Sequence, residues 1–293
     1  MKTPSTASRR DFLKQLVWLA STAATVRSAS GLPGAELAPG QLPQITLGNL
    51  KVSRLLLGSN PFFGFAHGNP QATGEAMKAW YTNEQIMTVL DAAAAQGITA
   101  VWTPCYDNWV RLWNRYQERG GKLKIWIGQP DPGPEKMKEH IRIAAQNGAK
   151  AICIQGMQVD TQVQAGKFDV LREWLELIKS FGLPAGMATH GARTHLLAEE
   201  KGLPTDFYHQ TLYRPDNYVR AGLEESLATI EKLAKPVVGY KALGAGRVLP
   251  KDTLPYIFKR LKPKDGLCIG AFPKKKDELA ENAGLVRECS SLG

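Results

Sequence analysis

Short apolar runs and longer segments of helical period alternate eight times along this chain, and this alternation constrains the fold more than any other feature. The runs occupy residues 55–58, 99–103, 124–128, 151–155, 185–188, 206–211, 237–241 and 267–270. Two strands joined by a helical crossover pair in parallel. The sequence therefore predicts a parallel sheet with a helix after each strand.

The helical segments carry start and stop signals. The clearest lie at residues 83–96, 134–147 and 168–181. Thr82 can cap the first of them and Pro134 suits the first turn of the second. A glycine follows each segment, at Gly97, Gly148 and Gly182. We therefore expect well-defined helices that end shortly before the next strand begins.

Eight such units predict an α/β fold of the (β/α)8 TIM-barrel type rather than an open sheet. An open doubly wound sheet favours a Gly-rich phosphate turn after an early strand, whereas residues 55–64 read LLLGSNPFFG. No linker or break in composition divides the chain after residue 43. We expect a signal segment at 1–30, a flexible Pro/Gly-rich linker at 31–43 and one barrel domain at 44–293.

The first thirty residues resemble a twin-arginine (Tat) signal peptide. Arg9 and Arg10 precede Phe-Leu-Lys, then come an apolar run at 16–26 and the small residues 28–30. The resemblance implies the Tat export machinery as a partner, removal of the segment, and a periplasmic or otherwise exported protein. An Arg-rich disordered terminus is the alternative. The apolar run is too short to span a bilayer and no later run is long enough, so we expect no stable membrane span after processing.

The charge and the cysteines exclude several functions. The formal net charge is +10, but the basic residues are scattered along the chain, so nucleic-acid binding is not expected. We expect a small-molecule substrate instead. The four cysteines form no CxxC pair, which leaves a structural zinc site unsupported. Cys105, Cys153 and Cys268 lie in or beside apolar runs, and burial as small hydrophobic side chains is favoured over disulfides.

In a parallel barrel, functional side chains gather where the strands end. The residues there include Ser59, His67, Gln129, Asp131, Asp160, Thr189 and Arg193. As catalytic candidates we single out Lys241, His190, Tyr106, Gln155 and His209. As substrate-binding candidates we single out Asn60, Asp107 and Arg214.

Lys241 ends an apolar strand and runs into a Gly-rich turn. Partial burial there would lower the pKa of its amine and make it a base or a Schiff-base nucleophile. An ion pair with a neighbouring carboxylate is an equally good interpretation. His190 and His209 can transfer protons near neutral pH, and a two-His site with Asp107 or Asp160 could hold a metal. No HxH or HxxxH spacing supports the metal, so we predict none.

Aromatic residues accompany the first two strand ends. Phe62, Phe63 and Phe65 follow the first strand, whereas Trp109 and Trp113 follow the second. Aromatic rings beside polar groups suit sugar binding. The two tryptophans are four residues apart on an expected helix, however, and this spacing favours packing.

Residues 44–58, QITLGNLKVSRLLLG, resemble the opening of the aldo-keto reductases, in which a hairpin closes the bottom of a TIM barrel before the first strand. Residues 97–103 and 270–284 extend the resemblance to the second and eighth strands. The resemblance implies a β-hairpin plug and NADP-dependent reduction of a carbonyl. It also implies that Lys274, Lys275, Lys276 and Asn282 hold the cofactor's adenosine phosphate. A solvated lysine run is the alternative.

The catalytic tetrad of that family is not retained. Trp102 stands where the family has Asp, Gln129 where it has Lys, and Gln155 where it has His; only Tyr106 matches. A Gln cannot lower a phenol's pKa as an ammonium can. We therefore expect an exported barrel enzyme acting on a small polar or carbohydrate-derived substrate. Three hypotheses stay open: an NADP-type oxidoreductase, a cofactor-free lyase or isomerase using Lys241 and His190, and a non-catalytic sugar or metabolite binder.

Overall fold

The structure, a computed structural model, describes residues 41–67, 71–212 and 222–291. The expected signal segment 1–30, most of the linker 31–43, and Arg214 lie outside the described residues.

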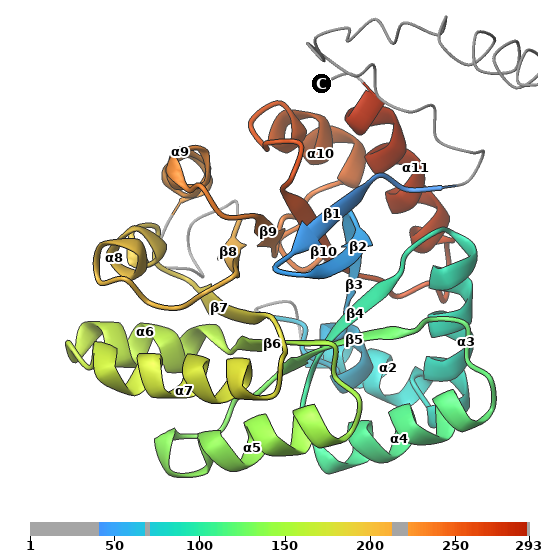
Figure 1. Ribbon diagram of the computed structural model, residues 1–293. Helices are drawn as coiled ribbons and strands as arrows, with labels where there is room; N and C mark the ends of the chain where they lie inside the picture. Colours follow the sequence, from blue (N-terminus) through green and yellow to red (C-terminus); the bar gives the residue numbers. More distant parts are fainter. Residues whose placement is uncertain (1–40, 68–70, 213–221, 292–293) are drawn as a thin grey trace, which may run out of the picture. The chain divides into compact units, whose positions relative to one another are not determined.

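Eight parallel strands close into a barrel in the order β10-β3-β4-β5-β6-β7-β8-β9, with helices around it (Figure 1). The strands are β3 Leu55–Gly58, β4 Ala100–Pro104, β5 Ile125–Gln129, β6 Ala151–Ile154, β7 Ala185–Thr189, β8 Phe207–Thr211, β9 Val237–Tyr240 and β10 Gly266–Gly270. Each lies within one residue of its predicted bounds. The predicted TIM-barrel fold is confirmed.

Helices connect the strands as expected. They are α2 Gln71–Trp80, α3 Asn83–Ala95, α4 Asp107–Glu118, α5 Pro134–Gln146, α6 Gly156–Gln164, α7 Phe168–Ser180, α8 Thr194–Glu200, α9 Leu223–Lys232, α10 Pro250–Phe258 and α11 Glu278–Ser291, with a short 3₁₀ helix at Asn60–Phe63. The Thr82 hydroxyl accepts the Gln85 N–H at 3.2 Å and caps α3. None of the helices in the described ranges is long and apolar enough to cross a membrane.

A β-hairpin closes the bottom of the barrel. Strands β1 Gln44–Leu47 and β2 Leu50–Ser53 pair antiparallel across a two-residue turn, in which Gly48 has a φ of +62°. A Cβ on Gly48 would lie 3.0 Å from Pro184, directly before β7, and one on Gly266, at the start of β10, 2.8 Å from Ile45. These contacts place the hairpin at the amino ends of the barrel strands, as the predicted plug requires.

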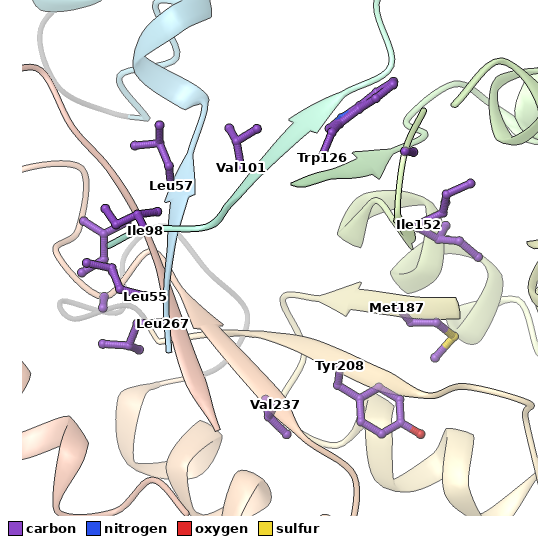
Figure 2. Close-up of a cluster of buried hydrophobic side chains, with 14 of the residues drawn as sticks. Leu55, Leu57, Ile98, Val101, Trp126, Ile152, Met187, Tyr208, Val237 and Leu267 are labelled. Carbon is purple, nitrogen blue, oxygen red and sulfur yellow. The ribbon is translucent and has the colours of Figure 1, made fainter. Parts of the chain in front are cut away.

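The apolar side chains form two cores. Inward-facing residues of the strands pack on Ile45, Leu47 and Val52 of the hairpin and fill the barrel. Outward-facing residues pack against the helices, and Figure 2 labels ten residues of this outer cluster. Alternation along each strand therefore sends one side chain inward and the next toward a helix.

The tryptophans and cysteines serve packing. Trp109 and Trp113 are 1% and 2% exposed and stack at 5.8 Å between ring centroids in the outer core. The interpretation of this pair as packing residues is confirmed. All four cysteines are free thiols, and Cys105, Cys153 and Cys268 are buried as expected.

Candidate active site

A cavity of about 590 Å³ opens at the carboxyl ends of the barrel strands. Its walls come from the segments that follow β3, β4, β5, β6, β7, β9 and β10. This volume is typical of sites for small molecules. The cavity lies at the opposite end of the barrel from the hairpin, where enzymes of this fold place their chemistry.

Three ionisable side chains form a row at one side of the cavity. His190 Nδ1 lies 2.9 Å from Asp160 Oδ2, and His190 Nε2 lies 3.3 Å from the Lys241 amine. Because Nδ1 donates its proton to the carboxylate, Nε2 presents a lone pair to Lys241. The row connects a buried carboxylate to an amine at the cavity wall through one imidazole.

Asp160 is held ionised by its partners. It is only 2% exposed, and burial alone would raise its pKa. Hydrogen bonds from the His190 ring, the Thr189 hydroxyl and the His190 backbone outweigh burial and hold the pKa below its ordinary value. The carboxylate can therefore fix the orientation of the imidazole and stabilise it when it carries a second proton.

The Lys241 amine is tuned toward its neutral form. Burial lowers the pKa of Lys241 from 10.5 to about 8, and the charge of Asp160 opposes this shift. Lys241 follows β9 directly, and its backbone has a φ of +63°, a left-handed conformation that a lysine adopts only with strain.

Gly156, the first residue of α6, makes room for the imidazole. A Cβ at this position would lie 2.8 Å from His190 Cε1 and 3.1 Å from the Tyr240 hydroxyl. The first distance is shorter than Cβ atoms show, and the second is tight, so a side chain at the start of α6 would push the imidazole from this position.

Tyr106 and Asp131 form a second polar pair on the wall built by β4 and β5. The Tyr106 hydroxyl donates to Asp131 Oδ2 at 2.6 Å. Burial and this bond to a carboxylate raise the pKa of Tyr106. Gln129 and Gln155 lie on the same wall, and the Gln155 side chain accepts the Gln158 N–H at 3.1 Å to cap α6.

Asn60 and His67 join the cavity from the loop after β3. Asn60 Nδ2 lies 2.8 Å from His67 Nε2, and Arg247 donates to the backbone oxygens of His67 and Gly244. Burial, with the nearby charges of Lys241, His190 and Arg247, lowers the pKa of His67 to about 4. His67 is therefore neutral at physiological pH.

Most of the predicted site residues share this cavity. Lys241, His190, Tyr106, Gln155 and Asn60 all line it. Their roles stay predictions, because position alone does not assign chemistry.

Two expected positions are wrong. His209 is fully buried inside the barrel and does not line the cavity, and the ring of Trp102 packs on it at 4.2 Å. It lies in the middle of β8, two residues before the strand ends. Asp107 is an exposed residue in the first turn of α4, where a carboxylate complements the helix dipole. Asp131 supplies the carboxylate on that wall instead.

The residues expected to hold a cofactor are divided between two hollows. Lys274 and Lys275 line a second, more open hollow beside Trp80, Asn282 lines the main cavity, and Lys276 lines both. The shared wall also carries Glu278 and Glu281, and Glu281 pairs with Lys276 at 2.5 Å. The four residues do not line one cavity together, and their role in holding a cofactor phosphate stays a prediction.

The expected alternative of a two-His metal site finds no geometric support. Within the described ranges, no three His, Cys, Asp or Glu side chains gather as metal ligands would. His190 bonds to Asp160, whereas His209 is inside the barrel.

The sequence does not indicate the hydrogen-bonding roles of Asp160, Asp131 and His67, and it gives no signal for Glu278. Strand-end position was the available signal for the first three. Asp160 lies 30 residues from its partner His190, Asp131 lies 25 from Tyr106 and His67 lies 7 from Asn60, so spacing alone does not show the pairs.

The closed parallel barrel with its rim cavity defines the chain as a TIM-barrel protein. No protein-family model matches the sequence, and no curated protein matches it. Among solved structures it is similar to the N-acetylneuraminic acid synthetase of Leptospira borgpetersenii serovar Hardjo-bovis, with 14% identity and a TM-score of 0.52 over 85% of this chain and 89% of that one.

Other similar structures share the barrel at lower scores. The glycerol dehydrogenase AKR11B4 of Gluconobacter oxydans matches with 16% identity and a TM-score of 0.49 over 71% of this chain and 66% of that one. The Rubisco of Pyrococcus horikoshii matches with 14% identity and a TM-score of 0.49 over 72% and 55%. This chain spans less than two thirds of the length of each of these two proteins. At 14% identity, the likeness to the synthetase shows the fold alone.

Proposed function

We propose that this protein is an enzyme that acts on a carbonyl compound through the amine of Lys241, as a cofactor-free lyase or isomerase. The observation that carries the proposal is the row of Asp160, His190 and Lys241, which ends in a cavity-lining amine with its pKa lowered to about 8. An ordinary lysine is almost wholly protonated at neutral pH, whereas this one is partly neutral and nucleophilic.

The row supplies the proton transfers that Schiff-base formation needs. The Lys241 nitrogen adds to the carbonyl carbon and forms a carbinolamine. The nitrogen of this adduct carries a surplus proton, which it passes to the lone pair of His190 Nε2, 3.3 Å from the amine. The imidazolium then returns this proton to the hydroxyl, which leaves as water while the nitrogen lone pair forms the C=N bond. Asp160 keeps Nδ1 protonated and balances the imidazolium charge that exists before delivery. The iminium product withdraws electrons from the adjacent carbon, which favours loss of a proton or cleavage of a bond there.

Two other functions motivated by the sequence are less well supported. An aldo-keto-type reduction uses a Tyr as proton donor, and Asp131 together with burial makes the Tyr106 phenol a weaker acid. A non-catalytic binder would not require an amine shifted toward its neutral form. The Tat-like segment supports a further proposal, that the enzyme works in the periplasm or outside the cell.

Reductive trapping tests the proposal. Erythrose and cyanoborohydride at pH 7.5 should convert the Lys241 Schiff base into a stable secondary amine, located by peptide mass mapping. From the pKa difference, the neutral fraction of Lys241 exceeds that of an ordinary lysine by on the order of 100-fold, so labelling should begin there.

Two variants sharpen this test. Lys241→Arg keeps the positive charge but removes the nucleophile, and it should abolish the fast label. Lys276→Arg alters another cavity-lining lysine and should retain it. Equal labelling of surface lysines with none favoured at Lys241 contradicts the proposal. Consumption of NADPH with the same aldehyde would favour the oxidoreductase instead.

A further inference from the structure

We propose that the substrate of this site is an uncharged polyhydroxy carbonyl compound, an unphosphorylated sugar in its open-chain form. The inference rests on the proposed function, in which Lys241 reacts with the carbonyl group of the substrate. It concerns the contacts to the rest of the substrate, and the evidence is the charges and hydrogen-bonding groups of the other cavity walls.

The charge of the cavity does not suit an anionic substrate. The charged side chains of Asp and Glu, Lys and Arg that line it, within the described ranges, are Asp131, Lys241, Lys276, Glu278 and Glu281. Lys276 is paired with Glu281, and Lys241 is the amine used for chemistry. A phosphate in the cavity would therefore meet two further carboxylates, Asp131 and Glu278.

The wall built by β5 offers a hydrogen-bond acceptor to the substrate. Asp131 takes the Tyr106 hydroxyl on Oδ2, and no group in the described ranges donates to Oδ1. The amides of Gln129 and Gln155 lie on the same wall. A carboxylate accompanied by amides binds neighbouring hydroxyls, because the acid accepts from one and an amide can donate to or accept from the next.

A further wall, from α11, carries a buried amide and a carboxylate. Asn282 is 4% exposed and lines the cavity, and within the described ranges its Oδ1 has no hydrogen-bond partner. Such a group is costly to leave unsatisfied. Glu278 lies on this wall, and burial and the charge of Glu281 raise its pKa. Glu278 Oε2 accepts the Phe272 N–H at 2.7 Å, and its negative charge would repel phosphate oxygens but not hydroxyl groups.

Aromatic rings supply the remaining contacts. Trp102, Phe272 and Phe65 line the cavity, and Phe65 is 41% exposed at the mouth. Ring faces pack on the C–H groups of a sugar while polar groups take its hydroxyls. Carboxylates and amides, aromatic rings and a nucleophilic amine in one cavity together match a sugar with a free carbonyl.

A matched pair of aldehydes tests the inference. Erythrose and erythrose 4-phosphate share the same aldehyde and differ in one phosphate. Their rates of cyanoborohydride trapping at Lys241 should be compared at equal free-aldehyde concentration. We expect at least tenfold faster trapping of erythrose, whereas an equal or faster rate with the phosphorylated aldehyde overturns the inference.

Charge-neutral variants locate the cause. Asp131→Asn and Glu278→Gln should each reduce the preference for erythrose severalfold, because each removes a negative charge from the wall. Asp107→Asn removes an exposed carboxylate that does not line the cavity and should leave the preference unchanged. If all three variants keep the full preference, the assignment of the two walls is wrong.

The two proposals can fail separately. If neither aldehyde labels Lys241 ahead of surface lysines, the proposed Schiff-base function fails. If both label Lys241 but the phosphorylated aldehyde is favoured, the function stands and the substrate class is wrong.

Discussion

Lys241 joins three properties in one residue: a nucleophilic atom, a lowered pKa and a hydrogen bond to an imidazole. Two opposing effects set its pKa. Burial removes water from the ammonium and lowers the pKa, while the Asp160 charge beyond His190 raises it. The residue is therefore sensitive to changes in a carboxylate that it does not touch directly.

This sensitivity gives a pH prediction. The initial rate of trapping at Lys241 should rise with pH to a midpoint near 8, where the amine loses its proton. Asp160→Asn removes the charge that favours the ammonium, so the midpoint should move to lower pH. Asp107→Asn serves as the control and should leave it near 8. A wild-type midpoint near 10 would show that burial does not act on this amine.

At this scale the sequence predicts positions better than pairings. Lys241, His190 and Tyr106 could be found because they follow apolar runs that end at one rim of a parallel barrel. The sequence does not show the partners of Asp160 and Asp131, because these partners follow other strands and are brought close only when the barrel closes. The expected position of His209 is wrong because closeness to a strand end does not determine whether a side chain faces the cavity or is buried inside the barrel.

Among the elements, the hairpin β1–β2 and helix α6 have the clearest separate tasks. The hairpin fills the amino end of the barrel with Ile45, Leu47 and Val52. Helix α6 begins with Gly156, which leaves space for His190 at the carboxyl end. The barrel is thus packed at one end and hollow at the other.

Leu47→Ala measures the contribution of the hairpin. Leu47 is fully buried, so the truncation should lower the free energy of unfolding by about 2–5 kcal/mol in urea titrations. Thr46→Ala, at the exposed neighbouring position of β1, should change it by less than about 0.5 kcal/mol. Because the hairpin is remote from the cavity, folded Leu47→Ala protein should still be trapped at Lys241. Equal effects of both substitutions would mean that the hairpin does not pack into the barrel.

Element boundaries could be predicted to within one residue for the strands, because the apolar runs are short and are bounded by glycine and polar residues. The hairpin could be predicted from the resemblance of residues 44–58 and its two-residue turn. The position of the α11 residues at the cavity could not be predicted from the sequence. Glu278 and Asn282 lie on a helix whose sequence does not show which face borders a cavity.

For the molecule as a whole, buried histidines link stability to pH. Burial lowers the pKa of His209 to about 3 and that of His195 to about 4, and both are fully buried. Since these values lie below 6.5, the unfolded chain binds more protons between pH 6.5 and about 4. The stability is fully present above pH 6.5 and is lost as the pH falls.

Urea unfolding at pH 7.5 and 5.0 measures this linkage. Each histidine should contribute roughly 1.4 kcal/mol per pH unit below 6.5, which gives a total loss of up to about 4 kcal/mol by pH 5.0. His209→Leu removes one of these two groups and should halve their joint contribution, while His67, whose pKa is also lowered to about 4, adds to the loss in both proteins. Phe207→Leu alters the neighbouring ring without a titratable group, so it should lower stability equally at both pH values. A wild-type stability that does not change between the two pH values would contradict the linkage.

The left-handed backbone at Lys241 sets folding against chemistry at a single position. A residue with a side chain costs about 1 kcal/mol or more in that conformation, whereas glycine adopts it freely. The turn after β9 would therefore form more easily with glycine there. A variant with glycine at this position would be more stable, but it would lack the amine on which the proposed reaction depends.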